Sequence, residues 1–208
     1  MNRKELLQHA KPILFNTDMV RAILGGRKTV TRRLQSKRIE NKWFDYEEFV
    51  NAVSTPESTS LTEKEFYEQY PPYQPGDVLY VRETWDYLEG WKIGDPSIDG
   101  KYFYKADGDL RPVSWRGNWR PSIHMPKEAA RIFLKVTNVR VERLQCMSWD
   151  DICNEGIIPD SNIRDKFSFE MLCNNFKNLW NSTIKKSELD RYGWDANPWV
   201  WVVEFEIL

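Results

Sequence analysis

Three residues that can do chemistry lie at fixed spacing just after a predicted helix end, and these are Lys28, Thr31 and Arg33. An amine can take up or release a proton, and a hydroxyl can attack a carbonyl carbon when a base removes its proton. A guanidinium group can bind an anion through paired hydrogen bonds. These three groups could therefore form a pocket that carries out acid–base or nucleophilic chemistry.

The residues before this stretch predict a short helix over Asp18–Leu24, in which apolar residues recur at i, i+3 and i+4. Asn16 and Thr17 are residue types that cap a helix N-terminus, and an acidic first turn favours the helix dipole. The pair Gly25-Gly26 supplies the left-handed conformation that ends a helix.

A β-branched, alternating strand is predicted over 29–32. In an extended chain, Thr31 and Arg33 share one face, whereas Val30 and Leu34 share the other. Lys28 can meet Thr31 only if Lys28 lies in the turn, a conformation that the double glycine permits.

Length and composition indicate one domain with insertions or one domain plus a small appendage, since 208 residues with 41% hydrophobic and 29% charged residues are typical of a globular protein. With a formal net charge of −1, the protein has no overall electrostatic attraction to nucleic acid or to an anionic membrane. Charge is uneven locally, because Arg27–Arg38 carries six basic residues and no acidic one. This basic strip is either a phosphate-binding surface or a solvated edge.

Cys146, Cys153 and Cys173 form no CxxC pair, and His9 and His124 are the only histidines. The sequence therefore predicts neither a disulfide framework nor a zinc site, and no cofactor. The polar N-terminus lacks an apolar run of the length of a signal peptide or membrane span, which leads us to expect a cytoplasmic protein.

Ten Trp, nine Tyr and ten Phe residues are many for this length. Most aromatic side chains fill cores. Some, however, lie among charges and prolines, as Trp85, Trp91 and the segment 115–121 do, and could line a groove in which a base stacks.

The rest of the chain predicts an α+β fold in which strands outnumber helices and do not alternate regularly with them. An insertion is expected at 35–72, with helices near 46–53 and 62–70. A long aromatic-rich loop region is expected at 85–120, and its first part, 85–100, is expected to be one loop. A register flip near Thr137-Asn138 suits a strand of a small barrel. Strands are expected at 12–15, 77–83, 101–105, 131–144 and 199–207, and helices from Ser148 to Glu155 and over Ser168–Asn181.

The spacing Gly26-x-Lys28-x-x-Thr31-x-Arg33 resembles the signature of the ASCH domain, a β-barrel fold related to the PUA domain of RNA-modifying proteins. The segments 75–79 and 199–205 are similar to the second strand and the closing strand of that family. The resemblance does not cover 34–72 or most of 85–120. It implies a single ASCH/PUA-like domain over 1–208, built as a small mixed β-barrel with peripheral helices.

Small bacterial members of this family hydrolyse acetylated cytidine with a lysine and a threonine from the signature and a glutamate from a later helix. The resemblance implies Lys28, Thr31 and Glu155 in these roles. Thr31 would attack the acetyl carbonyl, Lys28 would take the proton if burial lowers its pKa, and Glu155 would hold Lys28 or pass a proton to the leaving amine. Gly26, Arg33, Glu83 and Trp85 are expected to bind the substrate. Arg33 would bind a phosphate or an oxyanion, and Glu83 is the alternative to Glu155 as the carboxylate that completes the site.

The residues leave open whether the protein is an enzyme. Lys28 could instead be a solvated turn lysine, Thr31 a strand residue without a chemical role and Glu155 a surface residue. The expected partner is a modified nucleoside or RNA, and no membrane. One alternative function is a module that binds RNA or a modified base without catalysis. Longer ASCH-like chains with insertions also resemble phage-encoded proteins, which suggests an accessory protein of a phage or prophage.

Overall fold

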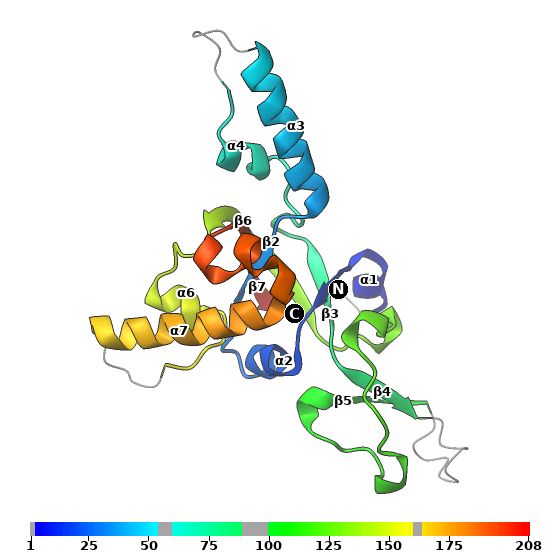
Figure 1. Cartoon of the computed structure of the whole chain (residues 1–208). Helices are drawn as coiled ribbons and strands as arrows, with labels where there is room; N and C mark the ends of the chain where they lie inside the picture. The colour runs from blue at the N-terminus through cyan, green and yellow to red at the C-terminus, as the bar shows by residue number, and fades with distance from the viewer. Residues whose placement is uncertain (1–2, 54–59, 89–99, 160–163) are drawn as a thin grey trace. The chain divides into compact units, whose positions relative to one another are not determined.

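The computed structural model describes residues 3–53, 60–88, 100–159 and 164–208 (Figure 1). The protein has an α+β fold with a five-stranded mixed sheet in the order β1-β3-β6-β7-β2 and a separate two-stranded sheet. Trp91, expected in a base-stacking groove, lies outside the described residues. In the described part of the chain, none of the helices is long and apolar enough to cross a membrane.

The chain divides into two compact units. Unit 1 comprises Met1–Lys28, Gly76–Val136 and Glu206–Leu208, and unit 2 comprises Thr29–Pro75 and Thr137–Phe205. The expectation of one domain over 1–208 stays a prediction, and each unit is described by itself below.

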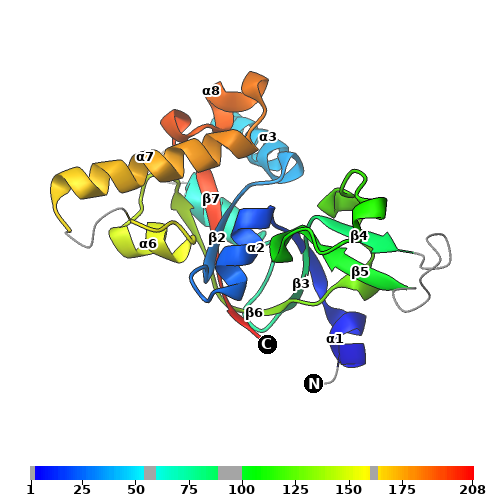
Figure 2. The same cartoon turned by 90° about the horizontal axis from the view of Figure 1, so that it is seen from below.

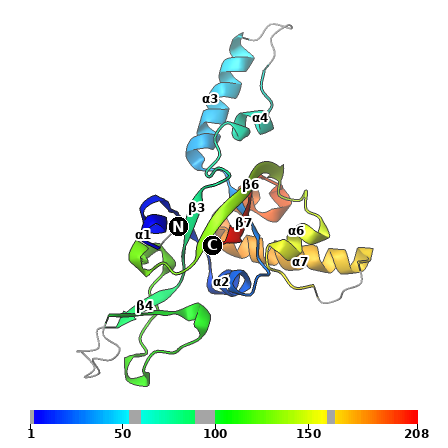
Figure 3. The same cartoon turned by 180° about the vertical axis from the view of Figure 1, so that it is seen from behind.

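In unit 1, strand β1 (Lys11–Leu14) pairs in parallel with β3 (Val78–Arg82), with Ile13 opposite Val81. Strand β3 pairs antiparallel with the first residues of β6 (Phe133–Arg143), and helix α1 (Arg3–His9) lies beside β3 (Figure 3). Helix α2 (Thr17–Leu24) follows β1. Strands β4 (Trp85–Leu88) and β5 (Lys101–Tyr104) form the two-stranded sheet.

Short 3-10 turns connect the strands of unit 1, and a small core holds the unit together. The turns span Lys105–Asp107, Val113–Trp115, Ser122–His124 and Lys127–Ala129. The core cluster consists of Ala10, Tyr80, Trp85, Met125, Ala129, Ala130 and Phe133.

In unit 2, strand β2 (Val30–Leu34) pairs antiparallel with β7 (Trp199–Ile207), with Thr31 opposite Val203. Helices α3 (Lys37–Val53) and α4 (Glu63–Glu68) lie side by side (Figures 1 and 3). Helix α6 (Trp149–Asn154) packs beside α7 (Lys166–Thr183), which crosses β7 (Figure 2). Helix α8 (Leu189–Tyr192) lies between the 3-10 turns Lys186–Glu188 and Trp194–Ala196.

The core of unit 2 forms where α6 and α7 pack on β2 and β7. Alternation along the paired strands directs Val30, Val200 and Val202 to the same face, where Phe176 and Trp180 of α7 cover them. Both faces of β7 are buried, since Val202 and its neighbour Val203 are both fully shielded from solvent. This burial explains why β7 is apolar at nearly every position rather than at every second one.

Several sequence predictions are confirmed. Strand β7 has the predicted bounds, and the α6 capping box of Ser148 and Asp151 makes both of its hydrogen bonds. Consecutive exposed residues Thr137 and Asn138 mark the predicted register flip in β6.

Other predictions are wrong. Residues 85–88 form strand β4, not part of a loop, because they pair antiparallel with β5, the next strand. No closed barrel is found among the described residues, because the strand pairing forms an open mixed sheet. Helix α3 begins at Lys37, well before the expected 46, and helices α1 and α8 were not expected.

Phe176 provides a test of the unit 2 core, because its ring is 2% exposed between α7 and the sheet. We expect Phe176→Ala to lower the free energy of unfolding by about 3–5 kcal/mol, through lost apolar burial and the cavity left behind. Urea denaturation measures the change. Phe167→Ala on the same helix is the matched control, since Phe167 is 69% exposed and should cost within about 0.5 kcal/mol. Equal losses of unfolding free energy in the two variants would contradict the assignment of Phe176 to the buried face of α7.

Candidate active site

The turn after α2 sets the position of Lys28 in unit 1. Gly26 has a φ of 67°, and its N–H donates to Ile23 O at 2.9 Å. The N–H groups of Arg27 and Lys28 both donate to Ala22 O, at 2.9 and 3.1 Å. Gly25 and Gly26 form the turn, and Lys28 follows it as a bridge residue before β2 rather than within the turn itself, where the double glycine predicted it.

The Lys28 side chain is buried, with 1% of its surface exposed, and it is among the largest fully buried side chains of the described residues. Its Nζ lies 5.6 Å from the ring centroid of Phe15, within the range of a cation–π contact. Lysine is almost never this buried without a specific environment. The interpretation of Lys28 as a solvated turn lysine is therefore wrong.

Glu83, also in unit 1, follows the last residue of β3 and is 1% exposed. Arg131 donates to both carboxylate oxygens, with Nε to Oε1 at 2.9 Å and Nη2 to Oε2 at 3.0 Å. The same guanidinium bonds to Asp107 at 2.6 and 2.9 Å. Burial raises the pKa of Glu83, and the hydrogen bonds from Arg131 oppose that rise without cancelling it.

Trp85 packs in the core cluster of unit 1 and is 5% exposed. Its ring lies 5.9 Å from that of Tyr102, and the guanidinium of Arg120 lies 5.1 Å from its centroid. A role of Trp85 in stacking on a substrate base stays a prediction.

In unit 2, Thr31 and Arg33 lie on one face of β2, opposite Val203 and Trp201 of β7. Thr31 is 3% exposed. Burial lowers the pKa of Arg33, while the charges of Tyr73 and Glu155 act in the opposite direction. The shared face of Thr31 and Arg33 agrees with the predicted alternation.

Arg32 points to the other face of β2 and is the centre of a buried ion cluster. Its Nη1 donates to Glu155 Oε1 at 3.3 Å. Its Nη2 lies 3.3 Å from Asp151 Oδ1 and 3.6 Å from Glu142 Oε2, as charge contacts without hydrogen-bond geometry. Three carboxylates thus surround one guanidinium that is removed from solvent.

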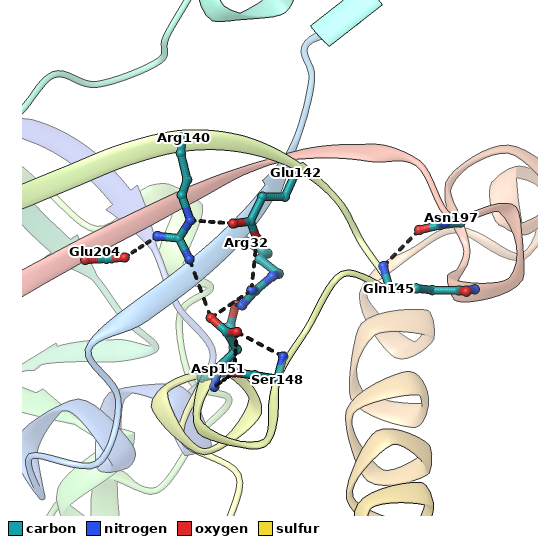
Figure 4. A network of polar contacts seen from close by, with 9 residues as sticks. Arg32, Arg140, Glu142, Gln145, Ser148, Asp151, Asn197 and Glu204 are labelled. Carbon is teal, nitrogen blue, oxygen red and sulfur yellow. Dashed lines mark hydrogen bonds and ion pairs between the residues drawn. The ribbon is translucent and has the colours of Figure 1, made fainter.

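A second arginine extends this cluster (Figure 4). Arg140 donates to Glu142 at 2.5 Å, bonds to Glu204 of β7, and lies 3.5 Å from Asp151. Asp151 also accepts hydrogen bonds from the Ser148 hydroxyl at 2.6 Å and the Ser148 N–H at 2.9 Å. The capping box therefore fixes the carboxylate that contacts both arginines.

Glu155 is the C-terminal cap of α6 and is 5% exposed, so the interpretation as a surface residue is wrong. One backbone hydrogen bond ties this helix end to the start of β2: the Thr29 N–H donates to Asn154 O at 2.9 Å. Thr29 is the residue that follows Lys28 in the chain. The end of α6 is therefore bonded to the middle of the stretch that contains Lys28 and Thr31.

The predicted site residues are distributed over both units. Unit 1 holds Gly26, Lys28, Glu83 and Trp85, and unit 2 holds Thr31, Arg33 and Glu155. Lys28, Thr31, Glu83 and Glu155 share an unusual property for polar residues, because each is at most 5% exposed.

Sequence reasoning missed the role of Arg32, which it placed in a basic strip. The signal was present, since alternation assigns Arg32 to the same face as Val30 and Leu34, where an arginine needs acidic partners. Lys37 of the same strip contacts Glu188 at 2.8 Å. The strip is therefore not a uniform solvated surface.

Neither a protein-family model nor a curated protein sequence matches the chain. A solved structure does: the ASCH domain from Lactobacillus crispatus JV V101, at 12% identity and a TM-score of 0.38. The match covers 100% of this chain and 86% of that one. No activity or substrate follows from this match.

Removing Arg32 tests the buried ion cluster. We expect Arg32→Met to lower the free energy of unfolding by about 3–5 kcal/mol, because Glu142, Asp151 and Glu155 would all lose the buried cation that they share. Arg38→Met is the control, since Arg38 is exposed and the change should cost within about 0.5 kcal/mol. Urea denaturation of both variants gives the comparison. A loss for Arg32→Met no larger than that for Arg38→Met would show that Arg32 contributes little net stability.

The stability that the ion cluster contributes depends on pH through the carboxylate of Asp151. Burial raises the pKa of Asp151, but the hydrogen bonds from Ser148 and the charge of Arg32 outweigh it, so the pKa lies below its ordinary value. Ionised Asp151 therefore stabilises the fold above about pH 3.9, and this contribution is lost as the pH falls through the lowered pKa. We expect the difference in unfolding free energy between wild type and Asp151→Asn to be largest near neutrality and to shrink in acid.

Denaturation at a series of pH values measures this difference, with Asp150→Asn, at a 65% exposed side chain, as the control. A difference for Asp151→Asn that stays constant from about pH 7 to about pH 2.5 would contradict the lowered pKa.

Proposed function

We propose that the protein acts on a modified nucleoside, as an amidohydrolase that removes the acetyl group from N4-acetylcytidine. The observation that carries the proposal is the hydrogen bond from Thr29 N–H to Asn154 O at 2.9 Å. This bond ties Thr29, the first of the two residues between Lys28 and Thr31, to the residue before Glu155.

Chain connectivity supports the grouping of the three catalytic residues. Lys28 and Thr31 are three residues apart, so their Cα atoms are separated by at most about 11 Å. A lysine side chain at this position can extend along part of that distance. Each of the three side chains is at most 5% exposed, and burial strengthens electrostatic interactions with a reacting group.

The proposed reaction has two steps. The Thr31 hydroxyl oxygen attacks the acetyl carbonyl carbon while the amine of Lys28 takes the hydroxyl proton. The C–N bond to the exocyclic nitrogen then breaks, and that nitrogen receives the proton and leaves as cytidine. Water hydrolyses the acetyl-threonine ester to acetate and restores the hydroxyl. Glu155, held by Arg32, orients Lys28 or passes on the proton.

A nucleoside fits the charges better than a long RNA does. The net charge is −1, and Arg32 is engaged with three carboxylates inside unit 2. A long RNA needs many exposed cations, because each neutralised phosphate contributes to affinity. Non-catalytic binding of a modified base remains the second candidate, supported by the burial of Glu155 against Arg32, which occupies this carboxylate.

Release of acetate from N4-acetylcytidine tests the proposal. We expect turnover by wild type and a fall of about 100-fold or more in kcat for Lys28→Ala and Thr31→Val, because each loses a group that moves a proton or forms a bond. Lys4→Ala and Thr137→Val, at exposed positions, are the matched controls and should retain activity. No turnover by folded wild type would overturn the hydrolase, and N4-acetylcytidine binding without turnover would support the binding module.

The same assay distinguishes the two carboxylates. We expect Glu155→Gln to lose activity, and Glu83→Gln to retain more of it, since Arg131 engages both oxygens of Glu83. The reverse order would assign the role to Glu83.

A further inference from the structure

A pocket in unit 2 lies between strands β6 and β7 and the segment 68–75, where the chain leaves α4. It has a volume of about 300 Å³, and its lining includes Pro71, Tyr73, Val139, Arg140 and Trp201. All of its lining residues belong to unit 2.

Strand pairing places one wall of this pocket on the face of the sheet that carries the proposed nucleophile. Trp201 of β7 is directly opposite Arg33 of β2, and Val203 is opposite Thr31. Directly paired residues of antiparallel strands project to the same side of a sheet, so Trp201 shares a face with Arg33 and Thr31. Thr31 lies two residues, or about 7 Å, from Arg33 along the strand, a distance comparable to the length of an acetylated cytosine.

The Arg33 guanidinium connects the pocket to the proposed catalytic carboxylate. Burial lowers the pKa of Arg33, and Tyr73 and Glu155 both oppose this effect electrostatically. Tyr73 belongs to the pocket lining, whereas Glu155 is the carboxylate assigned to the reaction. A wall residue of the pocket and Glu155 therefore lie within electrostatic range of the same guanidinium.

The charged residues of the lining already have partners of opposite charge. Arg140 donates to Glu142 at 2.5 Å and bonds to Glu204. Glu68 lies 3.7 Å from Lys64. The other lining residues are uncharged, so the pocket suits a neutral ligand better than a phosphate.

The size of the pocket and its aromatic walls indicate the class of that ligand. A cavity of about 150 Å³ holds one benzene ring, and small-molecule pockets start at about 300 Å³. This pocket therefore has room for a six-membered ring with a sugar attached. Tyr73 is half-buried and Trp201 is 4% exposed, so the fold holds both rings in place. Aromatic rings are the usual surfaces against which planar bases pack.

We propose that this pocket binds the base and ribose of the substrate nucleoside, with the pyrimidine ring packed against Tyr73 and Trp201. The inference rests on the proposed function and specifies it. The pocket provides affinity for the nucleoside, whereas Lys28 and Thr31 carry out the chemistry. The end of the insertion, through Tyr73 and its neighbours in 68–75, then has a role in substrate binding.

Titration calorimetry with cytidine, the product of the proposed reaction, tests the pocket. We expect cytidine to bind wild type and Val139→Trp to weaken binding about 10-fold or more, because the indole would occupy the pocket. Val139 is half-buried on β6, and aromatic side chains suit strands. Tyr73→Ala should also weaken binding about 10-fold or more, as a lost stacking contact does.

Matched variants separate binding from folding. Thr137→Trp, at an exposed position of the same strand, should bind cytidine as wild type does. Tyr73→Phe keeps the ring and should retain binding that Tyr73→Ala loses. Thermal denaturation establishes that each variant is folded, and Tyr73→Ala decides the test if Val139→Trp does not fold.

Cytidine binding also separates this inference from the hydrolysis. Thr31→Val should still bind cytidine, because it lacks only the attacking hydroxyl. Binding by wild type that Val139→Trp and Tyr73→Ala lose would support the pocket even if N4-acetylcytidine is not hydrolysed. Absence of cytidine binding to wild type, or equal affinity of wild type and the folded pocket variants, would overturn the pocket even if hydrolysis is observed.

Discussion

The guanidinium of Arg32 imposes the constraint on which much of unit 2 depends. An arginine cannot lose its charge in a protein, so its burial on β2 requires acidic partners. They come from β6, from the first turn of α6 and from the end of that helix, as Glu142, Asp151 and Glu155. The position of α6 on the sheet is therefore fixed by charge as well as by apolar packing.

The same interaction links the core of unit 2 to the proposed chemistry. Glu155 caps α6 at the point where Thr29 bonds to Asn154, and Arg32 holds its carboxylate. Ser148 fixes Asp151 at the other end of this short helix. A six-residue helix has little stability of its own, so these polar contacts at its two ends set the position of Glu155.

Gln35, three residues after Arg32, lacks the polar partners that Arg32 has. Arg32 is surrounded by three carboxylates, whereas neither end of the Gln35 amide has a partner among the described residues. Both side chains are nearly buried.

Local signals in the sequence determined the elements: the capping types at Ser148 and Asp151 predicted α6, and Gly25-Gly26 predicted the turn that precedes Lys28. Alternation likewise assigned Thr31 and Arg33 to one face. Contacts between distant residues decided the rest, as the ion pair between Arg32 and Glu155, 123 positions apart, illustrates. Burial of Lys28 and the open sheet depend on such distant contacts, which local propensity and spacing do not encode.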